Sequence, residues 1–109
     1  MIEWRIEPVP VYVIAQLKFT KEELYRRYQA RFFDVFKQFN GKLLVADEKP
    51  ATLEGSWPHD KIVVMEFPEQ AEAERFINSS AYQEISKDRI AGAETVSLLV
   101  RGLPQPTPK

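Results

Sequence analysis

The side chains best suited to acid–base chemistry lie in residues 54–67, which read EGSWPHDKIVVMEF. His59 is the one histidine of the chain, and an imidazole can act as a general acid or base near neutrality. Its neighbours Pro58 and Asp60 are turn formers, which favours a solvated loop residue over a catalytic one. Glu66 lies near the end of an apolar stretch. It could be a base or hydrogen-bond acceptor if it faces a pocket, or an ordinary solvated acid at a strand end.

Two further side chains could bind a ligand. Trp57 could form the wall of a pocket, or it could pack as a lid on the core, as tryptophan in a turn often does. Arg89 could bind an anionic ligand through two parallel hydrogen bonds. It could equally pair with an acid such as Glu54 or Glu66, and the spacing does not decide between these roles.

The composition excludes several classes of site. The chain has 109 residues and no cysteine, which excludes disulfides, thiolate metal sites and a thiol nucleophile. A single histidine and scattered carboxylates do not form a metal-ligand set, and haem bound through His59 would need a large cavity around that residue. We therefore expect neither a metal nor a cofactor.

Charge and hydropathy limit the expected partners. The formal net charge is -1 and neither half of the chain is strongly basic, so no nucleic-acid partner is expected. The apolar run at residues 9–17 is shorter than the roughly 20 residues that cross a bilayer. We expect no membrane association and a cytoplasmic location.

The hydrophobic periodicity predicts an α+β fold with the element order βαββαβ. The first helix has apolar residues at three- and four-residue steps, a capping-box spacing at Thr20 and Glu23, and Asn40-Gly41 as its end. The expected strands are residues 11–19, 42–47, 61–67 and 95–102, and the expected helices are 20–40, 69–79 and 81–90. This order is typical of a ferredoxin-like domain, a four-stranded antiparallel sheet with its helices on one face. We expect a single domain over residues 11–102, an N-terminal extension at 1–10, and a disordered tail at 103–109 because three prolines interrupt it.

The alternation of side chains along the strands predicts two different sheet faces. The first, apolar throughout, should lie under the helices; its expected members are Val11, Val13, Ala15, Leu17, Leu43, Val45, Val63, Met65, Phe67, Val96, Leu98 and Val100. The second is mixed, with Tyr12, Ile14, Gln16, Lys18, Lys42, Leu44, Ala46, Ile62, Val64, Glu66, Thr95, Ser97, Leu99 and Arg101. Left bare, its apolar members would form a larger patch than a soluble monomer usually exposes. We expect a second copy of the chain to cover it, with a pocket between the two sheets lined by Tyr12, Gln16, Glu66 and Ser97.

Several segments of residues 11–102 resemble an uncharacterised family called domain of unknown function 1330. The matching features are Gly41 before the second strand, the turn Leu53-Glu54-Gly55-x-Trp57, the strand end IVVMEFP at 62–68, the helix start SAYQ at 80–83, Arg89, and the closing Val100-x-Gly102. The resemblance implies the dimeric α+β barrel superfamily, which includes cofactor-free monooxygenases and isomerases, muconolactone isomerases and haem-binding relatives of chlorite dismutase. This sequence departs from the family pattern at Ala46, Asp47 and Glu48, where the family usually has an arginine and two glycines. Position 46 is expected to face the pocket, so the cation that the family arginine would place there is missing.

Two functional hypotheses remain from the sequence. In the first, the homodimer binds a small organic molecule and acts as a cofactor-free enzyme, with Glu66 as the base, Tyr12, Gln16 and Ser97 orienting the ligand, and Trp57 with His59 at the mouth. In the second, the dimer is a non-catalytic interaction protein whose barrel is filled by its own side chains. Similarity of fold is a weak guide between the two.

Overall fold

The computed structural model describes residues 4–6, 9–104 and 106–108. Seven elements make up the main domain, and their order matches the expected one. They are β2 (Val11–Phe19), α1 (Glu22–Phe36), β3 (Lys42–Asp47), β4 (Lys61–Phe67), α2 (Gln70–Ile77), α3 (Ser80–Gly92) and β5 (Ala93–Arg101).

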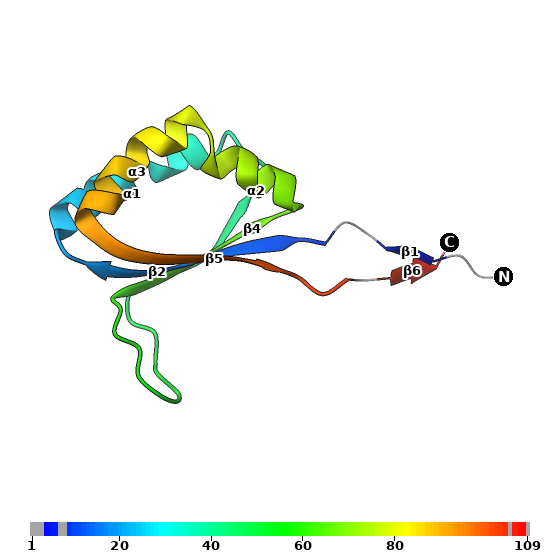
Figure 1. The fold of residues 1–109 in the computed structure, drawn as a ribbon, viewed down its shortest axis with the longest axis horizontal. Helices are drawn as coiled ribbons and strands as arrows, with labels where there is room; N and C mark the ends of the chain where they lie inside the picture. The colour runs from blue at the N-terminus through cyan, green and yellow to red at the C-terminus, as the bar shows by residue number, and fades with distance from the viewer. Residues whose placement is uncertain (1–3, 7–8, 105, 109) are drawn as a thin grey trace.

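The four strands form one antiparallel sheet in the order β3-β4-β2-β5. All three helices cover one face of this sheet, and the loop between β3 and β4 projects on the other side (Figure 1). This arrangement confirms the predicted α+β, ferredoxin-like fold with helices on one face. We call the face away from the helices the open face.

The chain ends pair with each other outside the main sheet. β1 (Trp4–Ile6) and β6 (Pro106–Pro108) form a separate two-stranded antiparallel sheet. Both N-terminal and C-terminal segments leave the same end of the main sheet (Figure 1). The expected extension at 1–10 and tail at 103–109 lie partly outside the described residues, and the domain limits of 11–102 stay a prediction.

The core forms between α1, α2 and the sheet, and the aromatic stripe of α1 supplies much of it. As the periodicity predicted, the buried residues of α1 are Tyr25, Tyr28, Phe32, Val35 and Phe36. Phe67 of β4 and Phe76 of α2 have no exposed surface, and their rings lie 5.6 Å apart. Full burial of such a side chain contributes roughly 1.5–3 kcal/mol, so these contacts hold the helices to the sheet.

The helix boundaries differ from the sequence predictions in their capping residues. α1 begins after Lys21, which has no side-chain cap hydrogen bond, so the capping box expected at Thr20 does not form. The N-cap of α3 is Ser79, whose side chain accepts a hydrogen bond from the backbone N–H of Tyr82 at 3.1 Å. The Ser80 and Gln83 spacing of the sequence predicted Ser80 as the cap. This prediction is wrong by one residue, because the adjacent Ser79 offers the same capping chemistry.

Gly41 has a packing role and does not terminate the helix. α1 ends at Phe36, and its C-cap Lys37 keeps a helical conformation. Gly41 is not left-handed. A Cβ at this position would lie 2.8 Å from the ring of Phe67 and 2.9 Å from that of Phe36. The close approach of two buried rings therefore requires glycine here.

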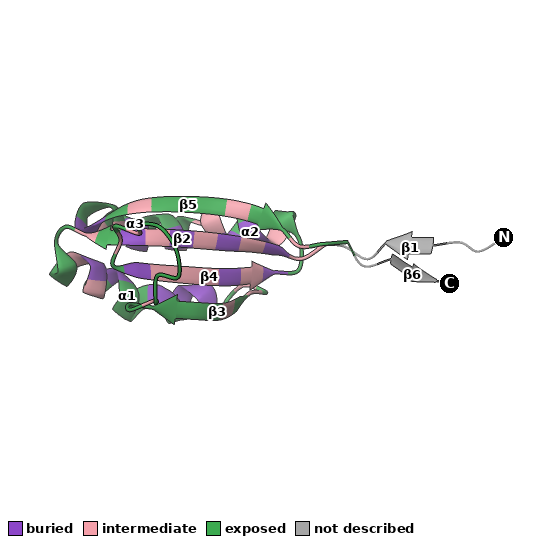
Figure 2. Cartoon of the chain, turned by 90° about the horizontal axis from the view of Figure 1, so that it is seen from below, coloured by how far each residue is buried: buried purple, intermediate pink, exposed green. Residues whose placement is uncertain are grey.

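Strand pairing corrects the predicted sheet faces in β3 and β5. In β5, Leu99 pairs with Val13 and Ser97 with Ala15, so the helix side carries Thr95, Ser97 and Leu99. The open face instead carries Val96, Leu98 and Val100, the opposite of the prediction. In β3 a bulge at Leu44 shifts the register, which places Val45 on the open face and Ala46 on the helix side. Viewed from the open face, β2 and β4 alternate between buried and half-buried residues while β3 and β5 are mostly exposed (Figure 2).

Candidate functional site

A cavity of about 320 Å³ lies between the sheet and the helices. Its floor is a row of small side chains across all four strands, in which Ala46, Val63, Ala15 and Ser97 are successive neighbours. Larger residues occupy the next rows of the sheet. The small row leaves a space beneath α1, whose residues Tyr25, Tyr28 and Phe32 line the cavity on the other side.

The walls of the cavity are largely aromatic and aliphatic, with a few polar groups. The apolar lining includes Tyr25, Tyr28, Phe32 and Phe33 of α1, Leu43, Met65, Phe76, Ile77, Tyr82, Val13 and Leu17; the polar lining is Gln29, Lys61, Arg89, Thr95 and Ser97. Gln29, Ala46 and Ser97 are exposed, so the cavity opens to solvent. An apolar space with a few converging polar groups is the usual form of a small-molecule site.

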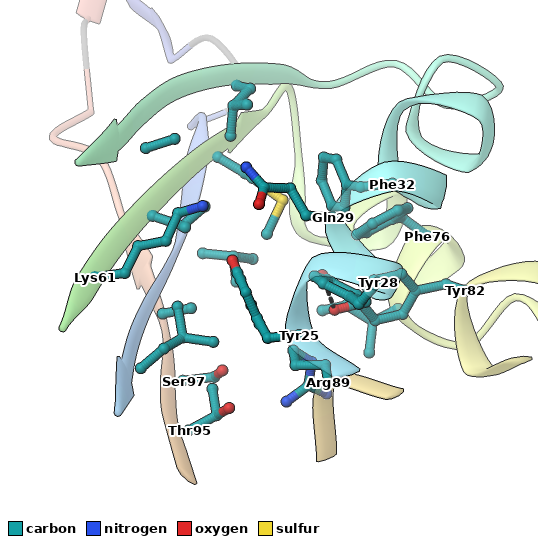
Figure 3. A pocket seen from close by; sticks show the side chains of 18 of the residues that line it. Tyr25, Tyr28, Gln29, Phe32, Lys61, Phe76, Tyr82, Arg89, Thr95 and Ser97 are labelled. Carbon is teal, nitrogen blue, oxygen red and sulfur yellow. Dashed lines mark hydrogen bonds between the residues drawn. The ribbon is translucent and has the colours of Figure 1, made fainter. Parts of the chain in front are cut away.

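Two polar atoms lining the cavity are buried without a hydrogen-bond partner among the described residues. They are Nε of Arg89 and Oγ1 of Thr95. The Arg89 guanidinium also lies 5.9 Å from the centre of the Tyr28 ring. Figure 3 shows Arg89, Thr95 and Ser97 along the lower edge of the view, at the margin of the cavity. Buried polar atoms are normally paired, so this margin is suited to a ligand oxygen.

Lys61 places an amine inside the protein. It begins β4 beside the buried Leu17, on the helix side of the sheet, and its side chain is only 4% exposed. Nζ lies 3.5 Å from a carboxylate oxygen of Glu48 and 5.0 Å from the centre of the Tyr25 ring. Burial lowers the pKa of Lys61, the charge of Glu48 opposes that effect, and the charge of Arg26 adds to it.

Arg26 holds the carboxylate that Lys61 approaches. Its guanidinium donates to both oxygens of Glu48, at 2.6 and 2.8 Å. These hydrogen bonds lower the pKa of Glu48 to about 2. Arg26 also donates to Glu22 and to Gln29 on the same helix. The carboxylate is therefore bound mainly by Arg26, and Lys61 receives the weaker interaction.

Two tyrosines make a closed hydrogen-bonded pair in the cavity wall. The hydroxyls of Tyr28 and Tyr82 lie 3.0 Å apart, and both residues are buried. Burial, with the neighbouring Tyr82, raises the pKa of Tyr28. Tyr25 has no such hydrogen bond in the described region. Its hydroxyl points into the cavity (Figure 3), and burial followed by the charge of Glu48 raises its pKa to about 12.

The predicted residues Tyr12 and Glu66 lie on the open face, as expected. They face each other across β2 and β4, and both are half-buried. Desolvation, then the charge and hydrogen bonding of Glu66, raise the pKa of the Tyr12 phenol. A phenol and a carboxylate that face each other on this mixed face could bind a polar group, and this role stays a prediction.

Gln16, Trp57 and His59 gather at the other end of the open face. The indole Nε1–H of Trp57 donates to Oε1 of Gln16 at 2.7 Å. The rings of Trp57 and His59 lie 5.2 Å apart, and Nδ1 of His59 is buried without a partner in the part of the chain that the structure describes. Trp57 thus fastens the long β3–β4 loop to the sheet, and His59 is more enclosed than a solvated turn residue.

The predicted site residues therefore occupy three separate places. Tyr12 and Gln16 lie four residues apart on one strand, roughly 13 Å at 3.3 Å per residue, so their two groups do not form one site. Arg89 and Ser97 lie on the other side of the sheet and line the cavity. The expectation that Ser97 faces a space between two sheets is wrong. Ser97 pairs with Ala15, which lies on the helix side of the sheet, so the two faces of β5 are the reverse of those predicted.

Ala46 also differs from its predicted position, and Lys61 was missed. The bulge in β3 turns Ala46 toward the helices, where it lines the cavity. Lys61 has the same parity as Val63, Met65 and Phe67, which were all assigned to the core. That parity was the signal that an amine would lie under the helices.

The described part of the chain also bears on metal binding and on membrane insertion. No group of three or more histidine, cysteine, aspartate or glutamate side chains within that part of the chain is placed to hold a metal ion. None of the described helices has the length and apolar character needed to cross a membrane.

Comparisons with known proteins agree with this fold. The family model for Domain of unknown function (DUF1330) matches residues 10–103. RPA0582, a protein of unknown function from Rhodopseudomonas palustris, is 19% identical with a TM-score of 0.75, covering 91% of this chain and 86% of that one. SnoaB, a cofactor-independent oxygenase from Streptomyces nogalater, is 9% identical with a TM-score of 0.64, covering 84% and 91%. HapK from Hahella chejuensis is 12% identical with a TM-score of 0.59, covering 85% and 92%. No curated protein gives a significant match.

Proposed function

This chain belongs to the DUF1330 family, and we propose that its cavity between the helices and the sheet binds a small organic molecule. The observation that carries the proposal is the row of small side chains at Ala46, Val63, Ala15 and Ser97, which leaves about 320 Å³ beneath α1. This volume lies within the range of small-molecule sites.

The charges around the cavity favour a ligand with an acidic or electron-rich end. Lys61 and Arg89 both line it, and Nε of Arg89 and Oγ1 of Thr95 have no partner among the described residues. A carboxylate, phenolate or enolate oxygen would satisfy those donors. The aromatic rings of α1 would then cover the apolar body of the ligand.

The reaction class that best suits such a site is cofactor-free proton transfer, isomerisation or oxygenation of an activated organic molecule. A cation close to a developing enolate stabilises it, and an enclosed apolar site strengthens that interaction. The similarity of the fold to SnoaB, a cofactor-independent oxygenase, supports this class by analogy of fold alone.

A thermal-shift screen tests binding in this cavity. The ligands would be small aromatic and aliphatic carboxylates and phenols, because these match the expected anionic end. A ligand at 100 times its Kd should stabilise the folded state by about 2.7 kcal/mol. Val63→Phe should abolish the response by filling the cavity floor, and the matched Val64→Phe on the open face should retain it. A response lost in Val64→Phe and kept in Val63→Phe would contradict the proposal.

We also propose that a second copy of the chain covers the open face. Its apolar residues on β5 are well exposed, with Val96 at 49%, Leu98 at 50% and Val100 at 36%, and β2 and β4 add Ile14, Ile62 and Val64. Burial of such a continuous patch favours association. Sedimentation at micromolar concentration should give a dimer for the wild type and a monomer for Leu98→Glu. A monomeric wild type would overturn this proposal.

A further inference from the structure

Lys61 combines three features that rarely occur together in an ordinary lysine. Its side chain is 4% exposed, it lines a cavity with mostly apolar walls, and Glu48, its acidic partner among the described residues, is bound more closely by another residue. A lysine usually keeps its ammonium group in water, since burying an isolated charge costs several kcal/mol. The structure therefore places an amine where burial works against its charged form.

The arrangement around Glu48 explains why the charge of Lys61 is poorly compensated. Arg26 binds both oxygens of Glu48 at 2.6 and 2.8 Å, while Lys61 lies 3.5 Å from one of them. The phenol of Tyr25, whose ring lies 5.0 Å from Nζ, also faces the amine, and the guanidinium of Arg89 lines the same cavity farther away (Figure 3). One carboxylate is thus shared by two cations, and the better hydrogen bonds go to the arginine.

We propose that Lys61 is the reactive amine of this cavity and forms an imine with an aldehyde or ketone that has an aromatic or aliphatic body. Desolvation in an apolar pocket and a neighbouring cation are the two known means of activating a lysine as a nucleophile. Lys61 has both. This inference rests on the proposed function, because the same cavity must first admit the carbonyl compound.

The chemical step needs no oxidant, reductant or further reactant. Neutral Nζ attacks the carbonyl carbon, a C–N bond forms, and the carbonyl oxygen takes up a proton to give a carbinolamine. Loss of the second proton from nitrogen and departure of the hydroxyl group as water then give the C=N bond. The phenol of Tyr25, which points into the cavity (Figure 3), is placed to exchange protons with the oxygen.

The experiment uses benzaldehyde as the probe on the full-length protein at pH 7, with cyanoborohydride to reduce any imine to a stable secondary amine. Peptide mapping by mass spectrometry then identifies the modified lysines. Lysines with the ordinary pKa near 10.4 are almost wholly protonated at this pH. The comparison lysines are Lys18, Lys21 and Lys42, which are all exposed. We expect Lys61 to be the dominant site of labelling although it is the least exposed of the four.

Two variants should change the labelling rate of Lys61 in opposite directions. Arg26→Met releases Glu48 to pair with Lys61, so labelling should slow. Glu48→Gln removes the carboxylate, so labelling should accelerate. A change of one unit in the pKa of an amine alters its neutral fraction about tenfold, and rate changes of that order are expected. Lys61→Met should remove the dominant label, and the melting temperature of each variant verifies that it is folded.

Benzoate separates failure of this inference from failure of the proposed function. If benzoate and benzaldehyde both stabilise the protein but labelling falls only on exposed lysines, the imine inference is overturned and the binding cavity stands. If neither compound nor any small acid stabilises the protein and Lys61 is not labelled, both are overturned. Selective labelling of Lys61, with the two opposite rate changes, supports both.

Discussion

Arg26 donates to both carboxylate oxygens of Glu48, at 2.6 and 2.8 Å, and so joins α1 to the loop that follows β3. This pair lies beside Lys61, which lines the cavity. It also explains why a lysine is stable in the folded protein at all, because Glu48 keeps a partial interaction with it at 3.5 Å. The same carboxylate thus holds two elements together and opposes the effect of burial on the pKa of Lys61.

Removing the amine should change stability in a pH-dependent way. Burial lowers the pKa of Lys61, so the unfolded chain binds more protons than the folded one between the folded and unfolded pKa values. Wild-type stability then rises with pH in that window. Lys61→Met, which has no charge to bury, should be as stable as or more stable than the wild type at pH 7. Its advantage should shrink as the pH approaches 10, measured by urea unfolding of both proteins. A difference independent of pH would contradict a lysine whose charged form is disfavoured by burial.

The tyrosine pair in the cavity wall should show strong coupling. Tyr82→Phe leaves the buried hydroxyl of Tyr28 without its partner at 3.0 Å, and such a loss costs about 1–3 kcal/mol. The double variant, Tyr28→Phe with Tyr82→Phe, removes both polar groups and should cost less than the sum of the two single changes. Urea unfolding of the three variants gives the coupling energy. Additive losses would show that the two hydroxyls do not interact.

Trp57 should stabilise the attachment of the β3–β4 loop to the sheet. Trp57→Phe keeps an aromatic ring but removes the N–H that donates to Gln16 at 2.7 Å, and we expect a loss of about 1 kcal/mol. Leu53→Ala in the same loop is the control, because Leu53 is 95% exposed and should change stability by less than about 0.5 kcal/mol. Equal effects of the two substitutions would refute the role of the hydrogen bond.

Gly92 should be intolerant of any side chain. A Cβ there would lie 2.6 Å from the backbone nitrogen of Tyr25 and 2.8 Å from the carbonyl oxygen of Lys21, and backbone atoms cannot move aside as a side chain can. Gly92→Ala should therefore cost at least about 2 kcal/mol by forcing α1 away from α3. Gly55→Ala meets no atom within 4 Å but must adopt φ 80°, which costs roughly 1–2 kcal/mol. If thermal unfolding shows that Gly55→Ala loses clearly more stability than Gly92→Ala, the close contact at Gly92 is contradicted.

The fold could be predicted from the sequence because its signals are local. The apolar stripe of α1 has helical spacing. β2, β4 and β5 are short runs rich in β-branched or aromatic residues, and β3 is a short run with three successive large apolar residues after a turn signal. Pairing between distant strands is not a local property. Residues 96, 98, 99 and 100 are all large and apolar, so the sequence does not show which of them face the helices. A one-residue error in this assignment exchanges the two faces of the whole strand.

The site was only partly predictable for the same reason. Arg89 was identified by its chemistry, and the structure places it on the wall of a cavity. The cavity itself depends on small residues from four strands being neighbours, and on a bulge at Leu44 that no local pattern indicates. Lys61 was not singled out from the sequence, although its parity matched the core.

The most direct measurement is methyl NMR of the wild-type protein during titration with the strongest ligand of the thermal-shift screen. Val63 and Val64 are adjacent in the chain but face opposite sides of the sheet, since Val63 lines the cavity and Val64 pairs with Ile14 on the open face. We predict that the methyl signals of Val63 and Met65 shift while those of Val64 and Ile14 do not. Shifts confined to Val64 and Ile14 would place the ligand between two sheets, beside Tyr12 and Glu66, and would contradict a binding cavity under the helices.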